Sequence, residues 1–190
     1  MNAPAPATHD PGPSPALPVA PPVPSPSTAA FRQGMARLAG AVNVITTDGP
    51  AGIAGFTASA VCSVTDSPPT VLVCMNRGSF AHPFFKRNGV LCVNVLSAGQ
   101  EGLSALFSDR NVSMAERFDR TPWAACASGA PGLDGALVQI DGRIVDTHEV
   151  GTHSVFIVEV DQVRTDDAVP APRGLAYFDR RYHALGAAAA

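Results

Sequence analysis

The sequence predicts a mainly β fold with peripheral helices. Apolar runs of strand length recur from Val42 to Val163, whereas only three segments show helical spacing of apolar residues. The chain is 46% hydrophobic and 15% charged, which is typical of a domain with a large buried core. Turn-forming residues separate the runs, so a barrel with helices around it accounts best for this order of elements.

The two ends of the chain differ from the part between them. Ten of the 18 prolines precede Ser27, in a stretch whose only charged residue is Asp10. Sequence of this composition buries too little apolar surface to offset its ordering entropy, so residues 1–26 are predicted to form a disordered Pro/Ala-rich tail. Residues 186–190 are a second low-complexity tail, which leaves residues 27–185 as one domain.

The first predicted elements are a helix and a β-hairpin. Thr28–Leu38 is expected to be an amphipathic helix, because its apolar residues recur at helical spacing as Phe31, Met35 and Leu38. Ser27 or Thr28 is available as its N-cap. A hairpin should follow, with strands at Val42–Thr47 and Ile53–Thr65 on either side of the turn-forming sequence D-G-P-A-G.

The remaining predicted elements are strands separated by two helices. Strands are expected at Thr70–Met75, Val90–Leu96, Ala136–Glu149 and His153–Val163. Helices are expected at Ser79–Asn88, which Gly89 ends, and at Ala98–Phe107. The last strand alternates apolar and acidic residues, so one of its faces should be solvated.

Charge and hydropathy narrow the range of partners. A net charge of -3 and a pI near 5.9, with no cluster of lysine or arginine, argue against nucleic acid. No apolar run approaches the length of a membrane span, and prolines interrupt the N-terminal stretch where a signal peptide needs an unbroken apolar region. We therefore expect a cytoplasmic protein that does not bind membranes.

Several catalytic motifs are missing from the sequence. No G-x-G-x-x-G follows a strand, and neither a Walker-type loop nor a G-x-S-x-G elbow occurs. The histidines lack H-x-x-x-H spacing, and the four cysteines form no C-x-x-C pair, so free thiols are expected and no metal site. A Rossmann dinucleotide site, metal-dependent hydrolysis and serine hydrolysis are therefore disfavoured.

The most informative segment is Gly55–Thr65, a strand-like run crowded with small and hydroxyl residues. Its side chains can donate or accept hydrogen bonds at Thr57, Ser59 and Ser63. Its small residues let a flat or phosphorylated ligand lie close to the main chain, at Gly55, Ala58 and Ala60. The segment is either one wall of a site for a polar small molecule or an ordinary Thr/Ser-rich strand with one solvated face.

Motifs spread over the whole predicted domain carry a resemblance to a known family. They include F-R-x-x-M-A-R-L from Phe31, A-V-N-V-I-T-T-D-G from Ala41 and A-G-F-T-A-S-A-V-C-S-V-T-D-S-P-P from Ala54. Later ones are V-L-V-C-M-N-R-G-S, L-C-V-N-V-L-S-A-G-Q-E, G-T-H and Y-F-D-R-R-Y-H. Together they resemble the flavin reductase family, which has the FMN-binding split β-barrel fold, and within it the reductases of pyrimidine utilisation.

This resemblance implies an activity and partners. The family members reduce FMN with NADH and supply FMNH2 to a partner flavin-dependent monooxygenase, here one expected in pyrimidine degradation. FAD and NADPH are the alternative flavin and nicotinamide nucleotides, and a homodimer is expected. Two other functions stay open: the reductase component of an aromatic-hydroxylating monooxygenase, and a split barrel that binds FMN without enzymatic activity.

The resemblance also implies the residues that bind the flavin. These are Thr57, Ala58, Ser59, Ser63, Cys74, Met75, Asn76, Asn94, Val95, Leu96, Ser97, Gln100, Phe107, Arg181 and Tyr182. The flavin phosphate is expected either at the helix start after Ser97, where free N–H groups and the dipole favour an anion, or at the Ser59–Ser63 turn. The two places are not distinguished by the sequence.

Several of these residues also have a purely structural interpretation. Asn94 can be a hydrogen-bonded barrel residue, and Ser97 and Gln100 can form a capping box. Phe107 and Tyr182 can belong to the core. A surface salt bridge is the alternative for Arg181.

His153 is the candidate residue for the nicotinamide side. In the family, a histidine in the G-T-H position lies by the flavin face and is thought to help hold NADH. No strong acid or base is required, because hydride passes directly between the rings and the protein has to stack them at short distance. The alternative is a strand-end histidine with a structural role.

Overall fold

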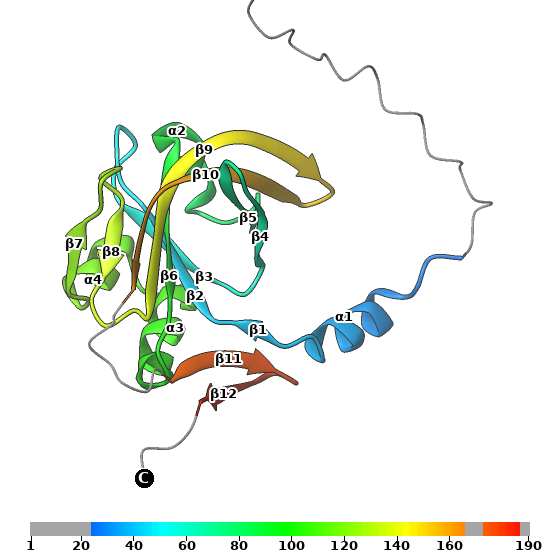
Figure 1. Ribbon diagram of the computed structural model, residues 1–190. Coiled ribbons are helices and arrows are strands. Elements are labelled where there is room, and N and C mark those ends of the chain that lie inside the picture. The colour runs from blue at the N-terminus through cyan, green and yellow to red at the C-terminus, as the bar shows by residue number, and fades with distance from the viewer. Residues whose placement is uncertain (1–23, 166–172, 187–190) are drawn as a thin grey trace, which may run out of the picture.

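A seven-stranded antiparallel sheet organises the computed structural model, which describes residues 24–165 and 173–186. The strand order is β3-β2-β6-β9-β10-β5-β4, and the sheet curves into a barrel with short helices around it (Figure 1). The predicted mainly β fold with peripheral helices is confirmed. The two predicted tails fall almost entirely on residues 1–23 and 187–190, which lie outside the described residues.

Helix α1 (Thr28–Ala36) begins where the sequence indicates, with Ser27 as its N-cap. The Ser27 hydroxyl accepts a hydrogen bond of 3.1 Å from the Ala30 N–H. The helix stands apart from the barrel (Figure 1), and its predicted apolar face is uncovered in the single chain. The exposed fractions are 60% for Phe31, 45% for Met35 and 66% for Leu38.

The predicted hairpin is confirmed as β2 (Asn43–Thr47) and β3 (Ala54–Ala58), which pair from Thr47 opposite Ala54 to Asn43 opposite Ala58. The side chain of Asn88 holds the connecting turn. It accepts from the Ala51 N–H at 2.8 Å and donates to the Gly52 carbonyl at 2.9 Å.

The predicted single strand Ile53–Thr65 is wrong, because the structure divides it into β3 and β4 (Val61–Asp66). These consecutive strands lie at opposite edges of the sheet. Ser59 and Ala60 make the crossing between the edges, where the Ala60 carbonyl accepts from the Cys74 N–H at 3.0 Å. A continuous strand could pair with only one edge, so the chain has to leave the ladder at this point.

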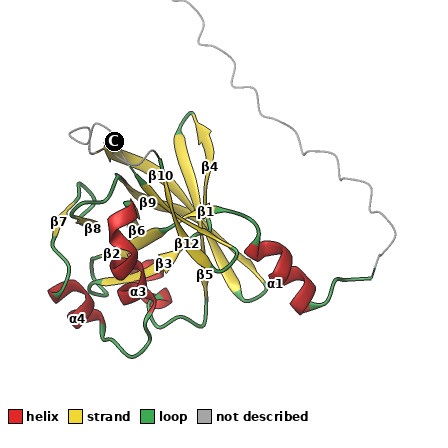
Figure 2. Cartoon of the chain, turned by 90° about the horizontal axis from the view of Figure 1, so that it is seen from below, coloured by secondary structure: helices red, strands yellow, loops and turns green. Residues whose placement is uncertain are grey.

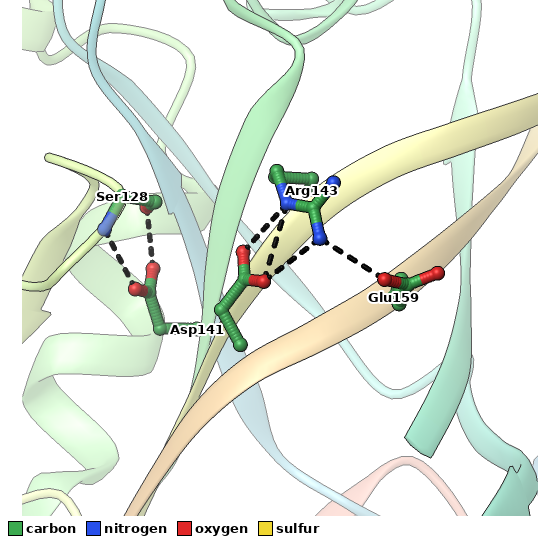
Figure 3. A network of polar contacts seen from close by, with 5 residues as sticks. Ser128, Asp141, Arg143 and Glu159 are labelled. Carbon is green, nitrogen blue, oxygen red and sulfur yellow. Dashed lines mark hydrogen bonds and ion pairs between the residues drawn. The ribbon is translucent and has the colours of Figure 1, made fainter. Parts of the chain in front are cut away.

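The other long strands follow the predicted positions closely. They are β5 (Pro69–Asn76), β6 (Val90–Val95), β9 (Val138–Val150) and β10 (His153–Thr165). The last two form a long hairpin, and Arg143 on β9 bridges Glu159 and Asp161 on β10 (Figure 3).

Two helices were predicted in this part of the chain, and both are present with shifted ends. Helix α2 (His82–Asn88) begins three residues late, and Gly89 ends it with φ of 69°. The second begins as a 3₁₀ turn, η1 (Ala98–Gln100), and continues as α3 (Glu101–Ser108). No helix among the described residues is long and apolar enough to cross a lipid bilayer.

Several short elements were not predicted. They are β1 (Gly40–Ala41), α4 (Met114–Asp119), β7 (Trp123–Ala125), β8 (Pro131–Leu133), β11 (Gly174–Phe178) and β12 (Arg181–Leu185). These elements are too short to show a clear period of apolar residues in the sequence. The β11–β12 turn places Asp179 and Arg180 at positive φ, a conformation for which glycine or asparagine is the usual sequence signal.

The two largest clusters of buried apolar residues hold these parts together. The larger one fills the barrel around Phe85 and Phe156, whose rings stack with centroids 6.3 Å apart. The smaller one lies beneath α3 and α4, which cover the same side of the sheet (Figure 2), and contains Phe107, Phe118 and Leu133. Met75 of the first cluster and Phe107 of the second both line the cleft that forms the candidate site.

Candidate functional site

A cleft of about 1060 Å³ opens between the strands and the segment that follows α3. One wall, here called the strand wall, comes from β3, the Ser59–Ala60 crossing, the end of β5 and His153 on β10. The facing wall, here called the loop wall, is made by residues between Phe107 and Arg117. A cleft of this size accommodates a nucleotide-sized ligand.

The first part of the strand wall is the predicted hydroxyl segment. Thr57, Ala58 and Ser59 all line the cleft. The Thr57 hydroxyl donates to the Ser104 carbonyl at 2.6 Å, which fixes its rotamer against α3. Gly55 also lies here, and a Cβ at this position would meet Phe107 Cε1 at 2.7 Å, so the absence of a side chain lets the two walls approach.

The second part of the strand wall joins β5 to β10. Cys74, Met75 and Asn76 line the cleft, and His153 lies directly opposite Asn76 in the strand register. The Thr152 hydroxyl and His153 Nδ1 are 2.9 Å apart, which restrains the imidazole. Burial raises the pKa of the Cys74 thiol, so this sulfur is a neutral, weakly polar part of the wall.

The loop wall is built around Arg117, whose exposed fraction is only 6%. Its guanidinium donates to the carbonyls of Phe107 at 2.9 Å, Gly55 at 3.3 Å and Asp109, and its Nε donates to Val112 at 3.2 Å. One side chain thus joins α3, the following loop and β3. Burial lowers the pKa of Arg117, and the charge of Asp109 opposes that shift.

The charges on the cleft surface are of one sign. Arg110 and Arg117 both line it, and no aspartate or glutamate is found among the described residues of its lining. The whole chain carries a net charge of -3, so this local excess of positive charge is a property of the cleft. It favours an anionic ligand.

Phe107 completes the set of predicted residues that line the cleft. The predicted residues that have not been placed so far lie outside its lining. Asn94 is fully buried in the barrel wall, where Nδ2 donates to the Val44 carbonyl and to Thr46 Oγ1, both at 3.1 Å. Its Oδ1 accepts from the Leu133 N–H at 2.8 Å. These contacts correspond to the structural interpretation of Asn94. Ser63 lies on the exposed edge strand β4.

The predicted helix-start residues also lie outside the cleft lining. Ser97 and Gln100 form the capping box, with the Ser97 N–H donating to Gln100 Oε1 at 3.0 Å. Gln100 Nε2 donates to the Asp134 carbonyl at 2.8 Å. Val95 pairs with Asn43 and Val138, while Leu96 belongs to the smaller core cluster.

The predicted C-terminal residues are not among the residues that line the cleft. The Tyr182 hydroxyl lies 2.9 Å from the side-chain hydroxyl of Ser104. The backbone carbonyl of the same serine accepts the hydrogen bond from Thr57. Tyr182 therefore supports the strand wall indirectly. Arg181 is exposed on β12, opposite Phe178.

Sequence reasoning missed the loop wall. Arg110, Asn111, Met114 and Arg117 line the cleft, as do Phe80 and Phe84 before and within α2. One signal for this wall was present: S-M-A-E from Ser113 is a capping-box pattern that predicts a helix start. The Ser113 hydroxyl indeed accepts from the Glu116 N–H at 3.2 Å, and the resulting helix α4 turns Arg117 inward.

Comparison with known proteins agrees with this arrangement. The chain is 55% identical over 157 residues to the FMN reductase (NADH) RutF of Cronobacter sakazakii, covering 82% of this chain and 92% of the relative. Among solved structures, the YcdH protein of Haemophilus somnus is 42% identical with a TM-score of 0.79, covering 84% of this chain and 99% of that protein.

Two further solved structures extend the comparison. The NADH:FAD oxidoreductase SgcE6 of Streptomyces globisporus, in complex with NAD and FAD fragments, is 30% identical with a TM-score of 0.74, covering 82% of this chain and 90% of that one. The styrene monooxygenase flavin reductase of Pseudomonas putida is also 30% identical, with a TM-score of 0.70 and coverage of 82% and 96%. Residues 35–186 match the model of the flavin reductase like domain. The chain therefore belongs to the flavin reductase family.

Proposed function

We propose that this protein reduces FMN with NADH and releases FMNH2 to a partner flavin-dependent monooxygenase. The observation that carries the proposal is the cleft itself, with a strand wall of hydroxyl, amide and small residues facing two arginines. Its relative in Cronobacter sakazakii carries the name of this activity at 55% identity. The test is loss of nicotinamide absorbance when purified protein is mixed with NADH and FMN; FMN-independent or absent oxidation contradicts the proposal.

The described residues fit an FMN molecule. A flavin needs room for a flat ring, hydrogen-bonding groups at the ring edge and cationic or N–H groups for its phosphate. Gly55 and Ala58 supply the room, Thr57, Ser59 and Asn76 supply polar groups, and the loop wall supplies positive charge. When bound, the flavin accepts a hydride from the nicotinamide.

We assign the phosphate to the arginine side of the cleft rather than to the helix start after Ser97. The Ser97 N–H donates a hydrogen bond to the Gln100 side chain, which in turn donates to the Asp134 carbonyl. Arg110, in contrast, lies on the cleft surface. Riboflavin lacks the phosphate, so it separates the two explanations. Arg110→Ala should raise the KM for FMN about tenfold and leave the KM for riboflavin unchanged. An equal change for both flavins contradicts this assignment.

His153 is proposed to hold the nicotinamide. It stands at the cleft rim opposite Asn76, where a second ring can lie over a flavin placed against the strand wall. The chain's contribution is to orient the two rings and exclude water from between them.

FMN and NADH are the proposed nucleotides, and FAD and NADPH are the competitors. The Streptomyces relative uses FAD, whereas the Cronobacter relative is an FMN reductase. Activity with all four combinations decides the preference. An FAD:FMN ratio of kcat/KM above one contradicts the proposed choice of flavin.

We also propose that the reduced flavin serves pyrimidine degradation in the cytoplasm. The support is the similarity to RutF, and the Pseudomonas neighbour is itself the reductase of a monooxygenase. A supply of NADH and four free cysteines suit a reducing compartment. Deletion of the gene should abolish growth on uracil as the nitrogen source while leaving growth on ammonium unchanged.

A homodimer is proposed from the uncovered apolar surface. Between 45% and 66% of the surface is exposed for the three apolar residues on and just after α1, Phe31, Met35 and Leu38. Val150, at the tip of the β9–β10 hairpin, is 63% exposed. Large apolar side chains left exposed together on one face of a helix are typical of an interface. Light scattering at micromolar concentration should give twice the 19.5 kDa chain mass. Phe31→Asp together with Leu38→Asp should shift it to the monomer mass.

A further inference from the structure

Two buried cysteines lie side by side outside the cleft. Cys92 on β6 is fully buried, and Cys126, directly after β7, is 7% exposed. Their Sγ atoms are 3.8 Å apart, within hydrogen-bond distance for thiols. They come from segments 34 residues apart, so the fold brings them together.

The surroundings accommodate this pair closely. Ala130 and Val90 pack against it. A Cβ on Gly132 would come within 2.8 Å of Cys126 Sγ, so this glycine leaves the room that the thiol occupies. Gly129 has a φ of 93°, and the Cys126 N–H donates to the Ala130 carbonyl at 2.9 Å, which closes a tight turn over the pair.

The two thiols are chemically unequal. The hydrogen bond between the two thiols lowers the pKa of Cys126, whereas that bond and burial raise the pKa of Cys92. Cys126 is also the more accessible of the two. A thiol with a lowered pKa beside a second, fully buried thiol is an arrangement in which the first can react with an oxidant and the second can resolve the product.

Asp141 raises the alternative of a metal site, because its carboxylate and both sulfurs lie within 4.8 Å of one another. Both carboxylate oxygens are already engaged, since Oδ2 accepts from the Ser128 N–H at 2.9 Å and Oδ1 from the Ser128 hydroxyl at 2.5 Å (Figure 3). Tetrahedral soft-metal sites use four ligands, and the described residues here provide three. The sulfur pair alone is sufficient for a disulfide.

We propose that Cys92 and Cys126 are a peroxide-reactive site that forms a disulfide. Cys126 attacks hydrogen peroxide: the O–O bond breaks, an S–O bond forms and one water leaves, giving Cys126 sulfenic acid. Cys92 sulfur then attacks Cys126 sulfur, and the oxygen leaves as a second water. Two thiols are oxidised by two electrons in total, and one peroxide is reduced to two waters.

The proposed function supplies this oxidant, and the inference rests on it to that extent. Reduced flavin that escapes its partner enzyme reacts with O₂, giving oxidised flavin and hydrogen peroxide. Disulfide formation at this site would therefore increase with flavin reduction that is not coupled to the monooxygenase. Because the disulfide needs only added peroxide, its formation can be tested without any reductase activity.

The experiment follows the linked peptides in the full-length protein. Trypsin places Cys92 in residues 88–110 and Cys126 in residues 121–143, while Cys62 and Cys74 share residues 38–77. After a small excess of hydrogen peroxide and alkylation, mass spectrometry should find 88–110 joined to 121–143 with the loss of two hydrogens. The number of alkylatable thiols should fall from four to two.

Variants separate the two steps. Cys92→Ser should leave Cys126 as a sulfenic acid that dimedone labels, and Cys126→Ser should leave Cys92 reduced. Cys62→Ser, on the exposed strand β4, is the matched control and should give the same linked peptide as wild type. A second arm replaces peroxide by NADH, FMN and O₂, and catalase should prevent the linkage in that arm.

The outcomes are distinguishable. Peroxide that oxidises Cys62 or Cys74 but leaves 88–110 and 121–143 unlinked overturns the inference, even if NADH oxidation is normal. Linkage by peroxide without NADH oxidation overturns the proposed function and keeps the site. Zinc bound in a 1:1 ratio to the purified protein, protecting both thiols from alkylation, also overturns the disulfide site in favour of a metal site.

Discussion

The two walls of the cleft are built by different means. The strand wall follows from backbone pairing: β3, β5 and β10 hold their side chains through ladder hydrogen bonds, and His153 faces Asn76 because of the register. The loop wall has no ladder. It depends on Arg117, which donates hydrogen bonds to carbonyls in three separate segments.

The two walls therefore differ in rigidity and in charge. The strand wall places polar groups at fixed positions, and most of its side chains are uncharged. The loop wall carries the positive charge and can change shape if its central arginine is lost. We therefore expect substitutions on the loop wall to lower stability and anion affinity together. Substitutions of polar residues on the strand wall should change the binding of either the flavin ring or the nicotinamide ring.

The largest effect is expected for Arg117→Met. The variant keeps much of the apolar volume but leaves the carbonyls of Gly55, Phe107 and Val112 without their donor, so unfolding free energy should fall by about 3 kcal/mol. FMN affinity should fall at least about tenfold. Chemical denaturation and flavin titration measure the two. The control is Arg120→Met at the C-cap of the same helix, where the exposed ion pair of Arg120 with Glu116 should contribute about 0.5 kcal/mol. Equal losses for the two variants would remove the special role of Arg117.

The contact between the walls is tested by Gly55→Ala. The added methyl would lie 2.7 Å from Cε1 of Phe107, a ring that is itself buried against Phe118. Overpacking of this kind should cost about 2 kcal/mol of unfolding free energy. Phe107→Leu removes the clashing atoms, so the double variant should be more stable than the sum of the two single changes predicts. Strict additivity in thermal unfolding would show that the walls do not meet there.

A more selective effect is expected for His153→Ala on the strand wall. The apparent KM for NADH should rise about fivefold and the KM for FMN should change by less than about twofold. Steady-state kinetics with each substrate varied in turn measures both values. His153→Gln, which keeps a hydrogen-bonding side chain, should recover part of the loss. Parallel increases in both constants would return His153 to a structural role.

The smallest effect is a pH dependence from His82, which lies behind the strand wall. Its Nε2 is 2.9 Å from the Ser154 hydroxyl, and its ring stacks on Phe156. Burial, then the positive charges of Lys86 and Arg77, lowers the pKa of His82 below its usual value near 6.5, against the opposing charge of Glu149. The folded state thus favours the neutral ring.

The sign of this dependence follows from linkage. Above pH 6.5 the ring is neutral in both states and its full contribution to stability is present; as the pH falls below 6.5 the unfolded state binds the proton first and stability is lost. The thermal midpoint of wild type should therefore drop more steeply between pH 7 and 5 than that of His82→Phe. Parallel curves would mean that His82 does not contribute.

One part of the strand wall could be predicted from the sequence, and the reason is local. Thr57, Ala58 and Ser59 stand in a short segment with strand periodicity and little bulk, whereas Cys74, Met75 and Asn76 were expected only from the family resemblance. The break at Ser59–Ala60 could not be predicted, because nothing local distinguishes a long strand from two strands that pair with opposite edges of one sheet.

Beyond Phe107 and the helix start at Ser113, the loop wall could not be predicted, because its shape depends on carbonyls that are distant in the sequence. An arginine in an E-R-F-D-R sequence is usually a surface residue, and here one of two neighbouring arginines turns inward while Arg120 remains exposed. Asn94 shows the opposite case. Both of its interpretations were compatible with the sequence, and its contacts with Val44, Thr46 and Leu133 depend on β2 and β6 of the large sheet meeting β8 of the two-stranded sheet.

The place of β5 between β4 and β10 also affects the order in which the chain can fold during synthesis. β5 pairs with β4 on one side and with β10 on the other, and β10 is made much later. Arg77, just after β5, is separated by 72 residues from its ion-pair partner Glu149 in the hairpin that completes the sheet. A ribosome needs roughly 4 to 14 s for that interval. Until then the strand wall lacks one edge, so the nascent protein has to leave the ribosome almost complete before it can take up a nucleotide.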